Sequence, residues 1–385
     1  MRLVKKILRA GLVVLLVLAA AALWKREEVT RLLAVNSLFA EDRIVQNFSN
    51  MDGLFLHREL PRGPHPVTAL PEDPRPMPAG LDAWMEARAV TGLVVLKDGR
   101  IAAERYRLGT APDDRRISWS VAKSYLSILL GVLLEEGAVA SLDVPVTDYA
   151  PDLRGSAYDG ARLRDVVQMA SGVEFNEDYF DFWSDINRMG RVLALGSSMD
   201  GFAAGLDRTR AAPGADWHYV SIDTHVIGMV IRGATGRSIH ELMAEKVIAP
   251  LGLERAPYYL TDGEGVAFVL GGLNMTTRDF ARFGLMVAQG GRIAGRRVVP
   301  ENWIAVSTTP SAPTDPGATQ YGYQWWIAPD APKGEVFARG VYGQYIFIDR
   351  ARGVVIAVNG ADREFRAPGA HESNIAMFRE IRDVL

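Results

Sequence analysis

Apolar residues along this chain group into two kinds of segment, which together predict a mixed α/β fold. The segment from Val121 to about Glu136 is apolar almost all round, a pattern typical of a helix buried in a protein core. Residues 373–385 place their apolar side chains on one helical stripe, suited to covering a sheet. Short runs of aliphatic and aromatic residues predict strands at 92–96, 101–106, 323–327, 345–348 and 354–358. Asp98-Gly99, between the first two runs, predicts a hairpin.

The order of these segments predicts an antiparallel sheet flanked by terminal helices, with an all-helical domain inserted in its middle. We place the sheet domain in residues 79–117 and 265–385, and the helical domain in residues 118–264. Residues 25–78 are expected to form a tether, because the stretch 61–78 is dense in proline and charge and disfavours regular structure.

The first 24 residues have the pattern of an export signal. Four basic residues precede an apolar run from Ala10 to Trp24. The run is shorter than the ~20 residues that a spanning helix needs, and Ile7 and Leu8 bring it close to that length. We expect an uncleaved signal anchor, with a transmembrane helix in the inner membrane and a periplasmic catalytic domain. The alternative is cleavage within the alanines 19–22, which would release the protein into the periplasm.

Composition excludes several classes of function. A net charge of -3 gives no support for a nucleic-acid partner. The chain has no cysteine, which excludes disulfides, thiolate metal sites and a cysteine nucleophile. It also lacks a P-loop, a dinucleotide fingerprint, a Gly-x-Ser-x-Gly elbow and a His-Glu-x-x-His zinc motif. The six histidines are scattered, and we expect His218 and His225 to be structural, so neither a metal nor an organic cofactor is expected.

Ser120 and Lys123, at the start of the apolar helix, are the candidate chemical groups. Residues three apart in a helix lie on one face, about one turn from each other, so the amine can reach the hydroxyl. A serine is a good nucleophile only when a base takes its proton, and burial of Lys123 would favour the neutral amine. Ser-x-x-Lys also arises by chance, with the serine capping a helix and the lysine solvated. The pair therefore needs support from the rest of the chain.

That support comes from motifs that follow the pair in order, at 137–146, 163–172, 219–221 and 271–282. In this order and at these distances the chain resembles the serine β-lactamase-like hydrolases, which include class C β-lactamases, DD-peptidases and esterases. The segments 146–151, 176–179 and 342–344 are most similar to the 6-aminohexanoate-dimer (nylon oligomer) hydrolases and related carboxylesterases. The resemblance covers roughly residues 80–385. It implies a β-lactamase/transpeptidase-like architecture, with the active site between the two lobes.

The resemblance also implies roles for individual residues. Ser120 would be the nucleophile and Lys123 its base, while Tyr219 would hand a proton to the leaving group, its phenolate favoured by the Lys123 cation. The backbone N–H groups of Ser120 and Val341 would form the oxyanion hole. Residues expected to contact substrate are Tyr179, Ser221 and Tyr342, the last on the leaving-group side. Tyr179 lies in an aromatic and acidic loop that packing on the helical domain would explain equally well.

The third family motif, Lys-Thr-Gly or His-Thr-Gly, is altered in this chain. Its best match, at 338–341, lacks the cation of the first position and keeps Gly340. Loss of that cation removes the expected partner of a β-lactam carboxylate and argues against efficient β-lactam hydrolysis. We do not expect Arg339 to replace it, because adjacent strand residues point to opposite faces.

These observations predict a serine hydrolase that cleaves ester or amide bonds of small substrates through an acyl-enzyme. One alternative is a cell-wall D-alanyl peptidase or amidase, and another is a non-catalytic penicillin-binding-like module. Retention of Ser120, Lys123 and Tyr219 together argues against the second alternative. The physiological substrate and the oligomeric state stay open.

Overall fold

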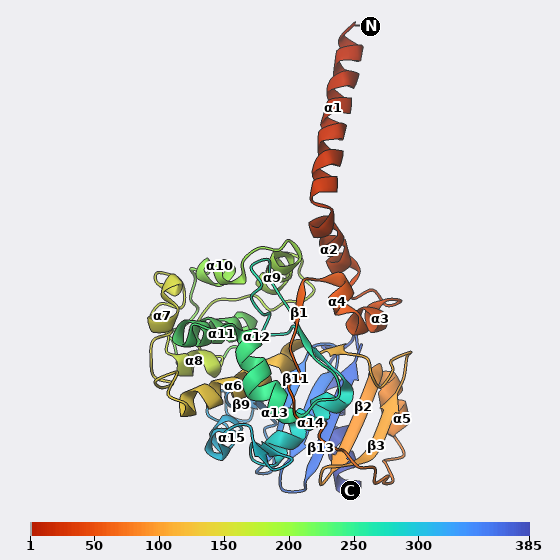
Figure 1. Ribbon diagram of the computed structural model, residues 1–385, viewed down its shortest axis with the longest axis vertical. Coiled ribbons are helices and arrows are strands. Elements are labelled where there is room, and N and C mark those ends of the chain that lie inside the picture. The colour runs from red at the N-terminus through yellow and green to blue at the C-terminus, as the bar shows by residue number, and fades with distance from the viewer. Residues whose placement is uncertain (1) are drawn as a thin grey trace.

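A seven-stranded antiparallel sheet is the centre of one lobe in the computed structural model (Figure 1). The structure describes residues 2–385 and the side chains of all of these except residues 2, 3, 17–19, 21 and 22. The strand order, β3-β2-β13-β12-β11-β10-β9, joins strands from both ends of the catalytic region, as the sequence pattern predicts. The strands are β2 (Val90–Lys97), β3 (Arg100–Tyr106), β9 (Gln320–Tyr321), β10 (Trp326–Ile327), β11 (Glu335–Gly340), β12 (Gln344–Asp349) and β13 (Val354–Gly360).

Helices cover both faces of this sheet, which explains why its strands are apolar on both sides. On β2, Leu93 and Val95 belong to the cluster formed with α5 (Leu81–Ala87) and α16 (Ala370–Val384). Val94 and Leu96 point the other way, into the main core, where α14 (Thr277–Ala288) lies against β13. Gly284 permits this close approach, because a Cβ there would lie 2.5 Å from Cγ1 of Val355. Small elements on the periphery are β7 (Arg292–Ile293), β8 (Arg296–Arg297) and α15 (Glu301–Ser307).

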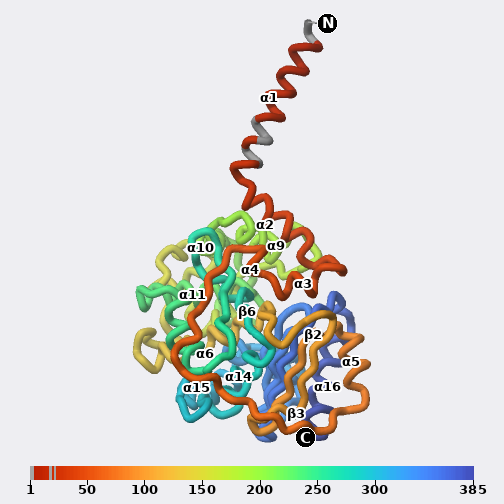
Figure 2. Tube along the Cα trace, turned by 45° about the vertical axis from the view of Figure 1, so that its right-hand side comes forward, coloured from red at the N-terminus to blue at the C-terminus, as the bar shows by residue number. Residues whose placement is uncertain are grey.

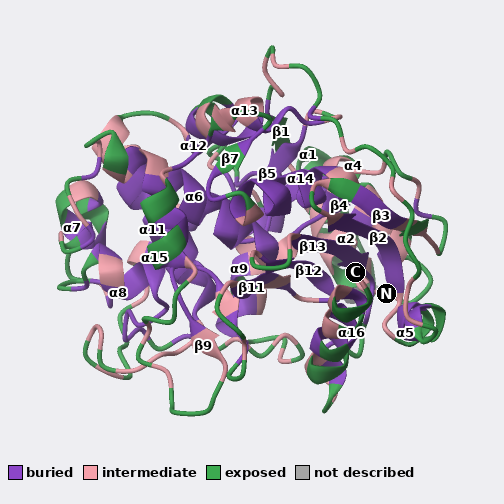
Figure 3. Ribbon diagram, turned by 90° about the horizontal axis from the view of Figure 1, so that it is seen from below, coloured by how far each residue is buried: buried purple, intermediate pink, exposed green. Residues whose placement is uncertain are grey.

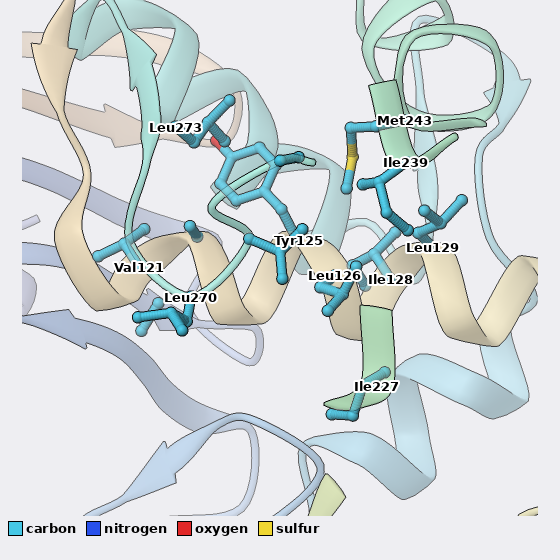
Figure 4. Close-up of a cluster of buried hydrophobic side chains, with 14 of the residues drawn as sticks. Val121, Tyr125, Leu126, Ile128, Leu129, Ile227, Ile239, Met243, Leu270 and Leu273 are labelled. Carbon is cyan, nitrogen blue, oxygen red and sulfur yellow. The ribbon is translucent and has the colours of Figure 1, made fainter. Parts of the chain in front are cut away.

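The other lobe is helical and is built around α6 (Ala122–Glu135), most of whose side chains are buried (Figure 3). Tyr125, Leu126, Ile128 and Leu129 of α6 pack with Ile227, Ile239, Met243 and Leu270 (Figure 4). The remaining helices are α7 (Val146–Tyr149), η2 (Pro151–Leu153), α8 (Leu163–Val167), α9 (Asp185–Ala194), α10 (Met199–Ala204), α11 (Ser221–Thr235), α12 (Ile239–Met243), η3 (Ala244–Ile248) and α13 (Ala249–Leu251).

A four-stranded antiparallel sheet, with the order β1-β5-β6-β4, lies beside the helical lobe. Its strands are β1 (His57–Glu59), β4 (Arg116–Ile117), β5 (Tyr258–Leu260) and β6 (Leu273–Met275). It brings together a segment from before the catalytic region and segments from both sides of the helical insertion. The chain passes directly from β4 into the short helix η1 (Trp119–Val121), which leads into α6.

A single helix, α1 (Arg2–Trp24), extends away from the rest of the molecule (Figures 1 and 2). In the described part of the chain, no helix combines the length and the apolar character needed to cross a membrane. Part of the predicted transmembrane segment, residues 17–19, 21 and 22, lies outside the described side chains, and the segment stays a prediction. Most of the side chains at the predicted cleavage site, alanines 19–22, lie outside the described ones. The periplasmic location stays a prediction.

Residues 25–78, for which the sequence predicts a tether, contain regular structure in their first half. The elements are α2 (Arg26–Ser37), α3 (Ile44–Ser49), α4 (Met51–Leu54) and β1. Leu38, Ile44, Phe48 and Met51 are buried in the main core, so this half is fixed by packing against the catalytic body. Residues 61–78, where proline is dense, have almost no regular structure.

The predicted strand at 323–327 is shorter in the structure, where only Trp326 and Ile327 are in β10. Gln324 has a φ of 66°, in the left-handed region, which interrupts the strand. Its buried side chain donates to the Val167 carbonyl at 2.8 Å and accepts from the Thr224 hydroxyl at 2.8 Å. These contacts between distant segments override the local strand pattern.

Candidate active site

Ser120 lies in η1, at the turn between β4 and α6, and its side chain is half-buried. The preceding residue, Trp119, has a φ of 43°. A bulky residue in the left-handed region costs roughly 1–2 kcal/mol, so the surrounding contacts must hold this conformation. One of them is the hydrogen bond from the Ser118 amide to the Leu273 carbonyl at 2.8 Å, which fixes the turn to β6.

Lys123 is one turn after Ser120 on α6, and only 1% of it is exposed. Its Nζ lies 3.0 Å from Oγ of Ser120, 2.8 Å from the Leu270 carbonyl and 3.4 Å from Oγ of Ser221. Burial lowers the pKa of Lys123 to about 7. The nearby carboxylates have the opposite effect on this pKa, but burial is the larger of the two. An amine with this pKa is largely neutral at slightly alkaline pH, so it is able to accept the Ser120 proton.

Tyr219 and Ser221 approach the lysine from the start of α11. The Lys123 Nζ is 5.4 Å from the centre of the Tyr219 ring, which stacks on Trp326 at 5.2 Å. Burial, followed by the charge of Glu177, raises the pKa of Tyr219, while hydrogen bonds with Ser120 and Ser221 oppose the shift. The structure therefore favours a neutral phenol at Tyr219 and not the phenolate expected from the lysine cation. A neutral phenol is a proton donor.

Two carboxylates near Lys123 were not among the residues singled out from the sequence. Glu177 accepts hydrogen bonds from the Ser221 amide and, at 3.0 Å, from the Tyr179 hydroxyl. Asp223 is fully buried on α11 and accepts from Tyr158 at 2.7 Å and from Ser171 at 2.9 Å. Burial raises the pKa of Glu177 and raises that of Asp223 to about 8. Glu177 is two residues before Tyr179, and Asp223 is two residues after Ser221. This proximity to predicted site residues is a signal in the sequence that could have identified both carboxylates.

The end of β11 lies against the Ser120 turn. At Gly340, a Cβ would be 2.7 Å from the Ser118 carbonyl oxygen and 3.1 Å from the Ser120 amide nitrogen, so the strand approaches this closely only with glycine. Within residues 2–385, neither the Ser120 nor the Val341 amide donates a hydrogen bond to another backbone group. These two N–H groups are therefore available to an acceptor placed at the turn.

Most of the predicted site residues line one cavity of about 120 Å³, namely Ser120, Tyr179, Ser221, Val341 and Tyr342. Lys123 and Tyr219 lie beside these residues but are not in the lining. Tyr179 also packs on the Phe365 ring, with centroids 6.0 Å apart, so the substrate-site and packing interpretations both fit it. Arg339 does not line the cavity and lies over the Trp326 ring at 5.8 Å.

The two histidines nearest the site in sequence have structural contacts. His225 is buried, with Nε2 2.7 Å from Asp200, which also holds Arg232 at 2.6 Å. His218 has its Nε2 3.4 Å from the Phe175 carbonyl. Neither lines the cavity at Ser120.

This fold, together with a lysine beside a serine at the start of a central helix, defines a known class of hydrolases. The Beta-lactamase family model matches residues 81–373, and the chain belongs to that family. The chain is 32% identical over 294 residues to the 6-aminohexanoate-dimer hydrolase of Paenarthrobacter ureafaciens, covering 72% of this chain and 74% of that protein. The resemblance to the nylon-oligomer hydrolases is thereby confirmed.

Solved structures show the same fold. A Bacillus anthracis protein, provisionally assigned as a 6-aminohexanoate-dimer hydrolase, superposes with a TM-score of 0.78 and 21% identity, over 90% of this chain and 95% of that one. A family VIII carboxylesterase superposes with a TM-score of 0.57 and 15% identity, over 80% of this chain and 98% of that one. At these identities the likeness establishes the fold alone.

Proposed function

We propose that this protein is a serine hydrolase that cleaves ester or amide bonds of small substrates through an acyl-enzyme formed on Ser120. The observation that carries the proposal is the buried Lys123 amine, 3.0 Å from the Ser120 hydroxyl, with its pKa lowered to about 7. A solvated lysine that merely follows a helix cap would keep its ordinary pKa near 10.4. Membership of a hydrolase family and the 6-aminohexanoate-dimer hydrolase relative support the same conclusion.

In the proposed acylation, the proton of the Ser120 hydroxyl moves to Nζ of Lys123 as Oγ bonds to the substrate carbonyl carbon. The carbonyl oxygen becomes an oxyanion that accepts from the Ser120 and Val341 N–H groups. When the intermediate collapses, the bond to the leaving group breaks. The leaving atom takes the proton of the Tyr219 hydroxyl, which regains one from the Lys123 ammonium. Water then attacks the acyl carbon, and its proton passes to Tyr219 as the Tyr219 proton passes to Lys123. The Lys123 ammonium returns a proton to Oγ of Ser120 as the bond between Oγ and the acyl carbon breaks.

A substrate panel tests the proposal against the peptidase alternative. The cavity at Ser120 has no lysine or arginine in its lining to pair with the terminal carboxylate of a D-alanyl peptide or a β-lactam. We therefore expect the full-length protein to hydrolyse p-nitrophenyl butyrate at least 100-fold faster, in kcat/KM, than N-acetyl-D-alanyl-D-alanine or a chromogenic cephalosporin. Faster turnover of the peptide would favour the cell-wall peptidase, and a folded protein inert toward all three would favour the binding module.

Tyr219→Phe tests the proton donor with two substrates that share one acyl group. Ethyl butyrate releases a strongly basic alkoxide that must be protonated, whereas p-nitrophenolate is stable as an anion. Both esters form the same acyl-enzyme, so the comparison uses kcat/KM, which reports acylation and not the shared deacylation. Because general acid catalysis contributes about 10²–10⁴-fold, we expect at least a 100-fold loss of kcat/KM on the ethyl ester and less than about a tenfold loss on the p-nitrophenyl ester. Equal losses on both esters would remove Tyr219 from this role.

A further inference from the structure

The segment before the catalytic body, residues 26–55, lies between α1 and the body (Figures 1 and 2). We call it the cap, because several of its residues line the cavity at Ser120. Its first helix, α2, contacts α9, and the Arg31 Nε donates to the Ala194 carbonyl at 2.8 Å. Its middle is held by Arg116, a fully buried residue of β4 that donates to the Val45 carbonyl at 2.6 Å and to the Ser49 hydroxyl at 2.7 Å. The cap is thus joined to α9 through its first helix and, through its middle, to β4, the strand that precedes the Ser120 turn.

Aromatic side chains of the cap touch the residues that flank the two candidate oxyanion amides. Phe39 stacks on Tyr342 with ring centroids 4.7 Å apart, and Phe48 meets Trp119 edge-on at 5.5 Å. Trp119 and Tyr342 both have left-handed backbones, with φ values of 43° and 60°. The cap therefore supplies part of the packing that holds this region of the site.

The cap also supplies one wall of the cavity at Ser120. Five residues of the cap line the cavity: Val35, Leu38, Phe39, Met51 and Phe55. The facing wall comes from α9 and from the loop at Leu270. Among the described residues, no lysine, arginine, histidine, aspartate or glutamate is in the lining, so a charged group placed there would lose its hydration without gaining a partner.

The position of Tyr219 indicates which part of a substrate enters this cavity. Tyr219, the proposed donor to the leaving group, lies beside Trp326 and does not line the cavity, whereas Ser120 does. With Oγ of Ser120 bonded to the carbonyl carbon, the leaving group points toward Tyr219, and the acyl chain extends into the cavity. Tyr342, expected from the sequence on the leaving-group side, instead lines this acyl-side cavity.

We infer that the cavity is a site for uncharged aliphatic acyl chains, and that the N-terminal cap forms one wall of it. This inference rests on the proposed hydrolase function and specifies its substrate class. Each methylene that leaves water for such a surface is worth about fourfold in affinity. A 6-aminohexanoyl group, whose ammonium would enter the apolar space, is disfavoured.

Gly190 provides a substitution that fills the cavity without disturbing the chemistry. It lies within α9, lines the cavity, and a Cβ added there meets no atom within 4 Å. Leucine also favours a helix more than glycine does, so Gly190→Leu should fold. Gly53 of α4 is the matched control, because an added Cβ there also meets no atom within 4 Å, while Gly53 is exposed and does not line the cavity.

The experiment compares the full-length wild type, Gly190→Leu, Gly190→Ala and Gly53→Leu on p-nitrophenyl acetate, hexanoate and 6-aminohexanoate. For the wild type and Gly53→Leu we expect kcat/KM for hexanoate to exceed that for acetate, and that for 6-aminohexanoate, at least tenfold. Gly190→Leu should lower the ratio of kcat/KM for hexanoate to kcat/KM for acetate at least tenfold. Gly190→Ala adds a smaller side chain and should lose less of kcat/KM for hexanoate. It provides the test if the leucine variant misfolds.

The experiment distinguishes failure of the acyl-site inference from failure of the proposed hydrolase function. If the wild type hydrolyses acetate through Ser120 but gains nothing from the longer chain, the acyl-site inference is overturned and the hydrolase proposal stands. The same holds if Gly190→Leu and Gly190→Ala fold and keep the wild-type ratio of hexanoate to acetate. If the folded wild type hydrolyses none of the esters, the proposed function itself fails.

Discussion

Ser120→Ala is expected to reduce kcat/KM for p-nitrophenyl butyrate by at least about three orders of magnitude, while the protein remains folded. Without the hydroxyl, no acyl-enzyme forms, and only binding and the candidate oxyanion amides are left to assist attack by water. The fold should be retained because the half-buried hydroxyl has hydrogen bonds only with Lys123 and Tyr219, each worth roughly 0.5–1.5 kcal/mol. Steady-state kinetics and a thermal melt measure the two effects.

Ser127→Ala is the matched control for this substitution. Ser127 lies on the same helix, α6, is fully buried, and its hydroxyl has no hydrogen-bond partner among the described residues. Its removal should leave kcat/KM within about twofold of the wild type. If Ser120→Ala is no more damaging than Ser127→Ala, Ser120 is not the nucleophile.

The second large effect is expected at Lys123. Lys123→Met retains most of the length and packing of the side chain but removes the base, and we expect a loss of kcat of at least about 1,000-fold. Lys123→Arg keeps the positive charge, and its guanidinium cannot lose a proton near neutral pH, so it should be equally inactive. If the arginine variant retained more than a tenth of the activity, the positive charge and not the base would be the important property.

The pH dependence of the wild type follows from the same amine. Its pKa in the folded protein is about 7, below the ordinary value near 10.4, so the neutral, proton-accepting form predominates above pH 7. The profile of kcat/KM for p-nitrophenyl butyrate should therefore rise with pH to a midpoint near 7 and level off above it. A profile that is flat from pH 5 to pH 9 would contradict the assignment of Lys123 as the base.

Local patterns account for the parts of the molecule that were predictable from sequence. The spacing of Ser120 and Lys123 fixes their proximity once α6 forms, and the 3.0 Å contact between them is what that spacing predicts. Asp98 and Gly99 both have positive φ, 49° and 79°, as the expected two-residue hairpin between β2 and β3 requires. In each case, the information lies within a few neighbouring residues.

Contacts between distant segments determine the parts that the sequence pattern missed. The cap is held by Arg116, which is 67 residues from Ser49 in the chain, so its position beside the active site depends on a contact between distant segments. Glu177 and Asp223 are ordinary acidic residues until the fold places them near the buried Lys123. The late start of β10, after Gln324, likewise follows from the contacts of Gln324 with Val167 and Thr224.

Covalent labelling of Ser120 is the most direct test of the central claim. The full-length wild type, Ser120→Ala and Ser127→Ala would be treated with a fluorophosphonate and examined by intact mass and peptide mapping. The account predicts one adduct on the wild type and on Ser127→Ala, mapped to Ser120, and none on Ser120→Ala. A folded wild type that takes up no label, or an adduct that persists in Ser120→Ala, would contradict it.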